Sequence, residues 1–159
     1  MPEPAVIPTV PYVDLPRFMG DWYVIANIPT FLETESYAAT ETYRQAPDGT
    51  ITTIFSQRKG SFEAPLKRYN QRAFVRKDSG NATWGMQFIW PLRAEYLIAH
   101  VNEEYSQAII ARTRRDFVWI LARTPALPES EFAALSDRVR ALGYDMSQLR
   151  RVPQPSPGT

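Results

Sequence analysis

The single histidine of this chain, His100, is the residue best suited to acid–base chemistry near neutral pH. A nucleophilic relay would need its imidazole close to a serine, but the surrounding segment, residues 94–101 (AEYLIAHV), is apolar and carries no such motif. In a segment of this kind, a histidine is more often a hydrogen-bonded core residue than a catalyst. We therefore expect no catalytic residue and a function other than an enzyme's.

The residue types argue against a metal site and against reactive cysteines. One histidine cannot supply a site of several imidazoles, and no cluster of carboxylates has the spacing of metal ligands. The absence of cysteine excludes disulfides, thiolate nucleophiles and cysteine-ligated zinc. We expect neither a metal nor a cofactor.

Aromatic side chains indicate binding instead. They make up 13 % of the chain, and in residues 82–90 (ATWGMQFIW) four large apolar residues alternate with other types. In a strand, that alternation places all four on one face, which must be covered. The four are Trp84, Met86, Phe88 and Trp90.

Eight segments rich in β-branched and aromatic residues are the predicted strands. They cover residues 22–28, 36–43, 50–57, 67–75, 82–90, 94–101, 107–113 and 116–122. Short turn-forming sequences such as APDGT and KDSGN separate them, which favours antiparallel pairing of consecutive strands.

One amphipathic helix is predicted after the strands, within residues 126–145. Its apolar residues recur at helical spacing and are Phe132, Leu135, Val139 and Leu142. This order favours an all-β barrel or sandwich with one helix packed outside. In the last strand Trp119 and Val118 lie on opposite apolar faces, as expected if one face lines a barrel and the other lies under the helix. A sandwich with a solid core stays open, because strand count alone does not decide.

The composition of the chain disfavours some classes of binding partner. The chain has 159 residues, enough for one domain, and a net charge of +1 gives no field that would attract nucleic acid. No run of residues is long and apolar enough for a membrane-spanning helix. Prolines force an extended backbone near the start. We expect an N-terminal arm over residues 1–11, one domain over 12–154 and a tail over 155–159.

Three motifs, in order, resemble those of lipocalins. GDWY at 20–23 resembles the Gly-x-Trp signature that opens the first lipocalin strand. NEEY at 102–105 resembles the motif between the sixth and seventh strands, and ILARTP at 120–125 resembles the motif with an arginine beyond the eighth. The resemblance covers roughly residues 12–154 and is closest to the bacterial lipocalins, relatives of apolipoprotein D. It implies an eight-stranded antiparallel up-and-down β-barrel, the lipocalin calyx, with a C-terminal α-helix packed outside.

The resemblance implies structural roles for the motif residues Gly20, Trp22, Tyr105 and Arg123. The glycine would let the chain turn tightly beneath the barrel. Trp22 would close that end, with the guanidinium of Arg123 over the indole face. Neither Trp22 nor Arg123 is expected to contact a ligand.

The inward face of lipocalin strands, carried onto this chain, implies a set of cavity residues. A shift of one residue would invert the set on any strand. The implied ligand-binding residues are Ala39, Glu41, Tyr43, Thr53, Phe55, Tyr69, Gln71, Trp84, Met86, Phe88, Trp90, Tyr96, Ile98, Phe117 and Trp119. The same alternation places Ala73 and His100 inward.

Glu41 is the charged member of that set. A carboxylate in an apolar interior is costly unless it is paired or hydrogen-bonded. Glu41 therefore either faces water or points inward and meets a tyrosine, a glutamine or an arginine near the mouth. In the second case it would belong to a small polar station among aromatic walls.

The resemblance implies binding, storage or transport of a small hydrophobic ligand, with a fatty acid or a lysophospholipid as the leading candidates. The tail would lie inside and the head group at the open end, because a buried charge loses its hydration. The loop IPTFLETES (28–36) would form part of a lid, with Phe31 and Leu32 at the mouth.

The cellular location and the alternative functions of the protein can also be stated as expectations. The resemblance implies the bacterial cell envelope, outer membrane or periplasm, if a leader was removed, and the cytoplasm otherwise. Peripheral membrane association and a homodimer are both compatible with the chain. A lipid-modifying or isomerising enzyme on this scaffold, and an interaction module that binds no ligand, stay open as alternatives.

Overall fold

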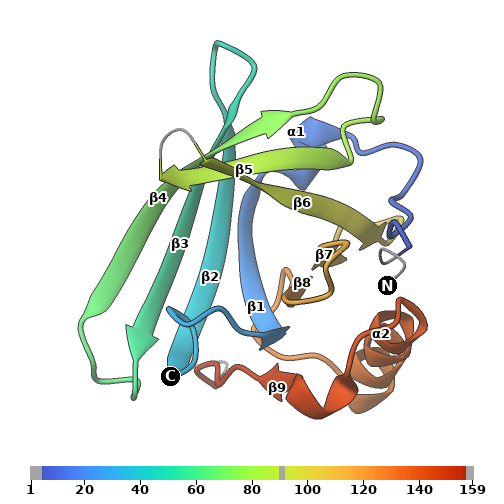
Figure 1. Cartoon of the computed structure of the whole chain (residues 1–159). Coiled ribbons are helices and arrows are strands. Elements are labelled where there is room, and N and C mark those ends of the chain that lie inside the picture. Colours follow the sequence, from blue (N-terminus) through green and yellow to red (C-terminus); the bar gives the residue numbers. More distant parts are fainter. Residues whose placement is uncertain (1–4, 90–91, 157–159) are drawn as a thin grey trace.

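The computed structural model describes residues 5–89 and 92–156, without the side chains of residues 88 and 89, and its main feature is a closed β-barrel (Figure 1). Consecutive strands pair antiparallel around the barrel, and β2 also pairs with β1, which closes the ring. The strands are β1 (Gly20–Ile28), β2 (Ser36–Gln45), β3 (Ile51–Lys59), β4 (Leu66–Val75), β5 (Thr83–Ile89), β6 (Leu92–Val101), β7 (Gln107–Ala111) and β8 (Val118–Ala122). The predicted barrel is confirmed, and the sandwich is excluded because one sheet returns to its own first strand.

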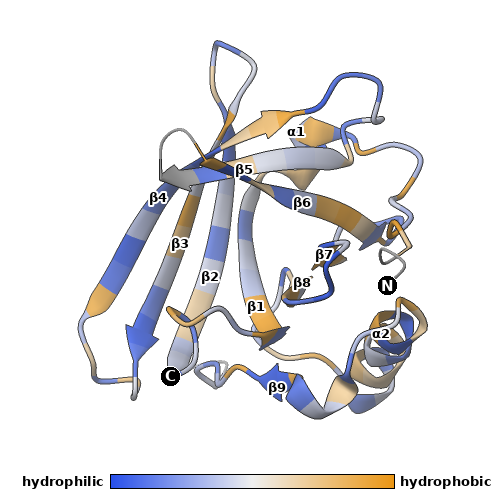
Figure 2. Cartoon of the chain, in the orientation of Figure 1, coloured by the Kyte–Doolittle hydropathy of each residue, from blue (hydrophilic) through white to orange (hydrophobic). Residues whose placement is uncertain are grey.

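The alternation of side chains divides the molecule into two apolar clusters. Figure 2 shows it as bands of contrasting hydropathy along β2, β3 and β4. On β8, Trp119 and Leu121 belong to the cluster inside the barrel, while Val118 and Ile120 belong to a second cluster outside it. Both faces of β8 are therefore buried, as the sequence predicts.

The helix α2 (Glu129–Ala141) covers the outer cluster and confirms the predicted amphipathic helix. It begins directly after Pro128, with Glu129 and Glu131 in its first turn, where acidic side chains favour the helix dipole. Its buried residues, Leu135 and Val139, pack in the outer cluster with β8. Within residues 5–89 and 92–156, no helix has the length and apolar character needed to cross a bilayer.

A short helix, α1 (Leu15–Phe18), lies at the end of the barrel opposite the β1–β2 loop (Figure 1). The side chain of Asp14 accepts a hydrogen bond from the backbone nitrogen of Arg17 at 3.4 Å, and Pro16 occupies the first turn. No pattern in the sequence had predicted this four-residue helix. Its consequence is that Phe18 is fully buried inside the barrel.

The segment before α1 lies along the barrel from residue 5 onward. Ile7 is buried in the outer cluster, and the backbone nitrogen of Val10 donates to the carbonyl oxygen of Ile98 at 3.0 Å. Gly80 has φ +64° and approaches so closely that a Cβ there would lie 2.0 Å from the carbonyl oxygen of Pro11. The contact between these two segments therefore requires a glycine.

The chain ends on the barrel as well. After the 3₁₀ helix η1 (Met146–Gln148), the short strand β9 (Arg150–Arg151) pairs with β1 at Ala26 and Asn27. It extends the sheet beyond the predicted eight strands. Because β8 pairs along the other edge of β1 and β2 pairs only from Gly20 to Tyr23, β9 occupies the edge of β1 that β2 leaves.

A β-bulge in β6 changes which residues face inward. Pairing with β7 runs from Ile98 opposite Ile110 to His100 opposite Ile109, so Ala99 is the extra residue. Ile109 belongs to the outer cluster, and directly paired residues share a face. The expectation that His100 faces the interior is therefore wrong, because the bulge inverts the alternation.

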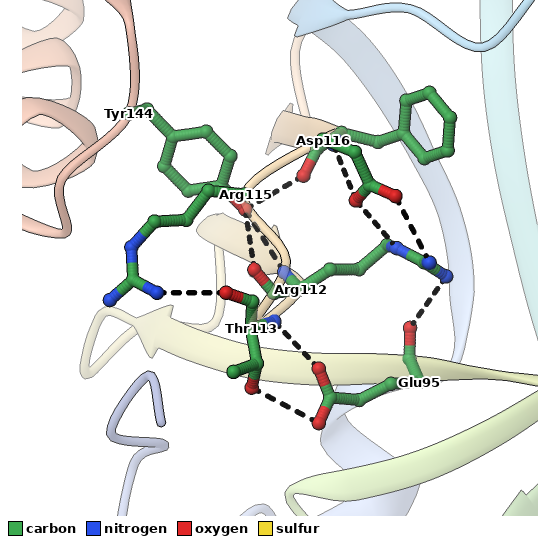
Figure 3. Close-up of polar contacts among 7 residues, drawn as sticks. Glu95, Arg112, Thr113, Arg115, Asp116 and Tyr144 are labelled. Carbon is green, nitrogen blue, oxygen red and sulfur yellow. Dashed lines mark hydrogen bonds and ion pairs between the residues drawn. The ribbon is translucent and has the colours of Figure 1, made fainter. Parts of the chain in front are cut away.

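The turn between β7 and β8 is longer than predicted, because residues 112, 113, 116 and 117 leave the strands (Figure 3). The guanidinium of Arg112 donates to both carboxylate oxygens of Asp116, at 2.8 and 3.1 Å. The hydroxyl of Tyr144 donates to the carbonyl oxygen of Phe117 at 2.7 Å and accepts from the backbone nitrogen of Arg112 at 3.0 Å. Burial raises the pKa of Tyr144 to about 12, which keeps that hydroxyl protonated as a donor.

Candidate functional site

Trp22 and Arg123 form the centre of the closed end of the barrel. Trp22 is fully buried, and its indole nitrogen donates to the carbonyl oxygen of Phe18 at 2.9 Å. The guanidinium of Arg123 lies 3.8 Å from the centre of the indole ring. It also donates to the backbone carbonyls of Asp21 at 2.7 Å and Tyr105 at 3.1 Å. Arg123 thus ties three segments together around one indole.

The other two motif residues lie beside this centre. Gly20 opens β1 with φ +99°, and a Cβ there would lie 3.5 Å from the guanidinium of Arg123. The hydroxyl of Tyr105 accepts a hydrogen bond from the backbone nitrogen of Asp14 at 2.9 Å, and the guanidinium of Arg17 lies 4.3 Å from the centre of its ring. Tyr105 therefore holds the short helix α1 against the barrel.

Four aromatic rings fill the half of the barrel interior next to the closed end, where α1 lies, and we call them the aromatic plug. They are Phe18, Trp22, Tyr43 and Trp84. The ring of Phe18 lies 5.0 Å from that of Trp22, 5.3 Å from that of Tyr43 and 5.7 Å from that of Trp84, centre to centre. The half of the interior next to the closed end is therefore filled by side chains.

Above the aromatic plug, the barrel encloses a cavity of about 220 Å³. Eight of the residues implied by the sequence line it: Glu41, Phe55, Tyr69, Gln71, Met86, Tyr96, Phe117 and Trp119. Seven further residues contribute to its walls and mouth: Thr30, Phe31, Leu32, Glu33, Ala94, Glu95 and Arg112. The walls are mainly apolar and aromatic, which suits a hydrophobic molecule.

The remaining implied residues do not line this cavity. Five lie in the packed interior and are fully buried: Ala39, Tyr43, Thr53, Trp84 and Ile98. The side chain of Phe88 and all of Trp90 lie outside the described residues. Four of the five lie closer to the closed end than the lining residues of the same strands, so for these the difference is one of depth along the barrel. Ala39 instead lies on the open side of Glu41, beside the bulge in β2.

The loop between β1 and β2 inserts a carboxylate into the cavity wall. Glu33 is buried and accepts hydrogen bonds from Asn27 Nδ2 at 3.0 Å, Thr30 Oγ1 at 2.9 Å and Trp119 Nε1 at 2.8 Å. Burial raises its pKa in spite of these donors. Glu33 was not among the predicted site residues, because nothing in the polar loop around it separates it from acidic residues that face solvent.

Phe31 and Leu32 precede Glu33 in this loop and lie at the open end of the cavity. The side chain of Phe31 is 82 % exposed, whereas Glu33 behind it is anchored inside. The anchor holds the loop over the mouth and leaves the phenyl ring in solvent.

Glu41 points inward, so the alternative that it faces water is wrong, and although tyrosines lie nearby it makes no hydrogen bond to them. The side chain is 6 % exposed, and its Oε2 has no hydrogen-bond partner among the residues that the structure describes. The nearby tyrosines Tyr43 and Tyr96 hydrogen-bond each other through their hydroxyls instead. Burial, with the negative charge of Glu33 as a second cause, raises the pKa of Glu41 well above its usual value.

The charges around the cavity are unevenly placed. Arg112 is the one cation among the described lining residues, and its guanidinium is already bound to Asp116 at the mouth (Figure 3). Glu95, also at the mouth, accepts from the backbone nitrogen of Thr113 at 2.6 Å. Inside, the acidic groups Glu33 and Glu41 face the cavity. Among residues 5–89 and 92–156 no group of three potential metal ligands comes together.

Comparison with known proteins agrees with this geometry. The family model described as a lipocalin-like domain matches residues 13–154 of the chain. The protein is a lipocalin. Lipocalins bind and transport small hydrophobic molecules, and this lipocalin has the closed barrel and the apolar cavity that such binding needs.

Relatives of this lipocalin come from plants, bacteria and animals. Temperature-induced lipocalin-1 of Arabidopsis thaliana is 28 % identical over 97 % of this chain and 86 % of its own. Outer membrane lipoprotein Blc of Escherichia coli K12 is 27 % identical over 96 % of this chain and 85 % of its own. Insecticyanin of the tobacco hornworm Manduca sexta, at 15 % identity, has the same fold with a TM-score of 0.75 over 98 % of this chain and 87 % of its own.

The outward-facing His100 gives this lipocalin a measurable pH dependence. Partial burial, and secondarily the charge of Arg138 on α2, lower its pKa from 6.5 to about 4. A lowered pKa means that the folded state favours the neutral imidazole, so the stability it contributes is full above pH 6.5 and is lost as the pH falls to about 4. An NMR titration of this single imidazole should show a midpoint near pH 4.

The control is the His100→Gln variant. Between pH 6.5 and 4 the wild type should lose about 1 kcal/mol of unfolding free energy relative to this variant, a value reduced for the solvent around a half-exposed group. Comparison with the variant cancels carboxylates that titrate in the same range. A midpoint near 6.5 would show that the imidazole is fully solvated.

Proposed function

We propose that this lipocalin carries single-chain lipids, fatty acids or lysophospholipids, with the acyl tail in the cavity and the head group at the open end. The observation that carries the proposal is the shape of the cavity: about 220 Å³, walled by aromatic side chains and blocked below by the aromatic plug. This volume is smaller than the roughly 300–1,000 Å³ of sites for drug-sized molecules. It therefore favours one slender chain over a bulky ring system.

Burial of such an acyl chain provides enough free energy for binding. Each methylene moved out of water contributes about 0.8 kcal/mol, so roughly ten methylenes contribute on the order of 8 kcal/mol before losses. Association and ordering subtract several kcal/mol. What remains is compatible with micromolar binding once contacts around the mouth are added.

Charge supports the orientation of the ligand. An anionic head group placed inside would meet the buried carboxylate of Glu33 in a poorly solvated site, and Arg112, the one cation among the described lining residues, is already bound to Asp116. At the open end, Lys59, Lys67 and Arg114 are exposed and available to carboxylate or phosphate groups. The head group of the proposed ligand therefore lies outside.

Exposed apolar residues at the open end support lipid exchange with a membrane surface. Five large side chains are exposed on the loops and strand ends around the mouth: Phe31, Leu32, Phe62, Leu66 and Leu92. Side chains of this kind can enter the interfacial region of a bilayer. We therefore include peripheral association of this end with a membrane in the proposal. The outer membrane lipoproteins among the relatives support a location in the bacterial envelope.

A carrier is proposed here in preference to an enzyme. The residue best suited to acid–base chemistry, His100, lies on the outer face of β6, away from the cavity. A ligand deep in the cavity would thus meet glutamate, glutamine and tyrosine side chains as its polar neighbours, and no imidazole is among the described lining residues.

The test is lipid extraction from the purified protein, with identification by mass spectrometry, followed by competition with the fluorescent probe N-phenylnaphthylamine. We expect co-purified single-chain lipids and displacement of the probe by palmitate and by lysophosphatidylcholine. If no lipid is recovered and neither molecule displaces the probe, the proposal is wrong. Size-exclusion chromatography of the same sample tests for a homodimer.

A further inference from the structure

A carboxyl group without a partner lies at the floor of the cavity. Glu41 lines the cavity, and its backbone pairs with Trp22 on β1 and with Phe55 on β3. It therefore stands directly above the aromatic plug, one inward position above Tyr43 on the same strand. A molecule that enters from the open end reaches Glu41 with the end that goes in first.

Three polar residues near Glu41 already have hydrogen-bond partners. Tyr43 and Tyr96 hydrogen-bond each other, and the carboxylate of Glu33 accepts from three donors. Of the described residues that line the cavity, Glu41 is the one that leaves a buried side-chain oxygen unpaired. Such groups are rare in folded proteins, because each loses its bonds to water and gains none.

The chemical form of Glu41 determines what it can bind. Burial and the nearby Glu33 favour the neutral carboxylic acid. A neutral carboxyl offers one O–H donor and one carbonyl acceptor. Its complement is a group that can accept and, better, also donate a hydrogen bond.

We propose that Glu41 recognises an oxygen at the leading end of the bound chain, so that this lipocalin prefers single-chain lipids that carry a hydroxyl or carbonyl at the end remote from the head group. The inference rests on the proposed function and names the ligand class for the same cavity. A methyl end leaves the carboxyl of Glu41 unpaired, whereas a hydroxyl end completes its hydrogen bonds. Sites built to hydrogen-bond a hydroxyl discriminate strongly against analogues that lack it.

A charged leading end suits the site less well. A second carboxylate would lose its hydration and meet the carboxylate of Glu33, in a cavity whose one described cation is held by Asp116. An ammonium would require Glu41 to give up its proton inside the barrel next to Glu33. A neutral oxygen needs neither change.

The experiment compares matched chains as competitors of N-phenylnaphthylamine. Hexadecanoate, omega-hydroxyhexadecanoate and alpha-hydroxyhexadecanoate differ only in whether and where a hydroxyl is present, and hexadecylamine tests a cationic chain. We expect the omega-hydroxy acid to bind about tenfold more tightly than the other two acids. Equal binding of the three acids, or preference for the amine, would overturn this inference while leaving the carrier function intact. Failure of every chain to displace the probe would contradict the carrier function itself.

Two variants locate the effect at Glu41. Glu41→Leu removes the polar group and should abolish the preference for the omega-hydroxy acid or reverse it. Glu41→Gln keeps a donor and an acceptor in the same place and should retain most of the preference. Because Glu41→Leu replaces an unpaired buried group by an apolar one, its melting temperature should not fall, which confirms that it is folded. An unchanged preference in Glu41→Leu would refute the role of this residue.

Discussion

The Ala94→Trp variant should lose lipid binding by about a hundredfold or more while keeping the barrel fold. Ala94 lines the cavity from β6, opposite Met86 on β5. An indole at this position would occupy space that the ligand needs in a cavity of about 220 Å³. Excluding about four methylenes costs roughly 3 kcal/mol, which corresponds to a hundredfold loss of affinity. Competition with N-phenylnaphthylamine measures the effect.

A matched substitution separates blocking from general damage. Ala133→Trp makes the same chemical change at an exposed position of α2, far from the cavity lining, and should bind like the wild type. Circular dichroism should show an intact barrel in both variants. Wild-type affinity in a folded Ala94→Trp variant would mean that the ligand binds somewhere other than in this cavity.

The Trp22→Ala variant should be the most destabilised single substitution considered. The indole is fully buried, contacts Phe18 and lies under the guanidinium of Arg123. Its removal leaves a cavity in the packed closed end and strands a charged group, so we expect a loss of about 3–5 kcal/mol in unfolding free energy. For a chain of this size that lowers the melting temperature by about 6–20 °C.

Two controls belong to this measurement. Tyr12→Ala removes an exposed aromatic side chain and should change stability by less than about 0.5 kcal/mol. Trp22→Phe retains a ring beneath Arg123 and should fall between the wild type and Trp22→Ala. A Trp22→Ala variant as stable as Tyr12→Ala would show that the closed end can rearrange around the missing indole, contrary to the contacts described.

Much of the fold follows from local patterns in the chain. The alternation on β8 correctly separates the inside residue Trp119 from the outside residue Val118, because side-chain direction in a strand has a period of two. The spacing of Leu135 and Val139 correctly identifies the helix that covers the outer cluster. Where the period is interrupted, as at the bulge before His100, the same reasoning assigns the wrong face.

The site divides in a similar way. The sequence by itself determined the eight strands and the covering helix through their periodicity, and its three short motifs implied the barrel and the contact of Arg123 with Trp22 at the closed end. Only the tertiary structure decided how deep the cavity runs and which polar groups reach it. Phe18 joins the aromatic plug from a four-residue helix, and Glu33 reaches the cavity from a loop, where it accepts a hydrogen bond from Trp119. Both depend on contacts between segments far apart in the chain, which no local pattern encodes.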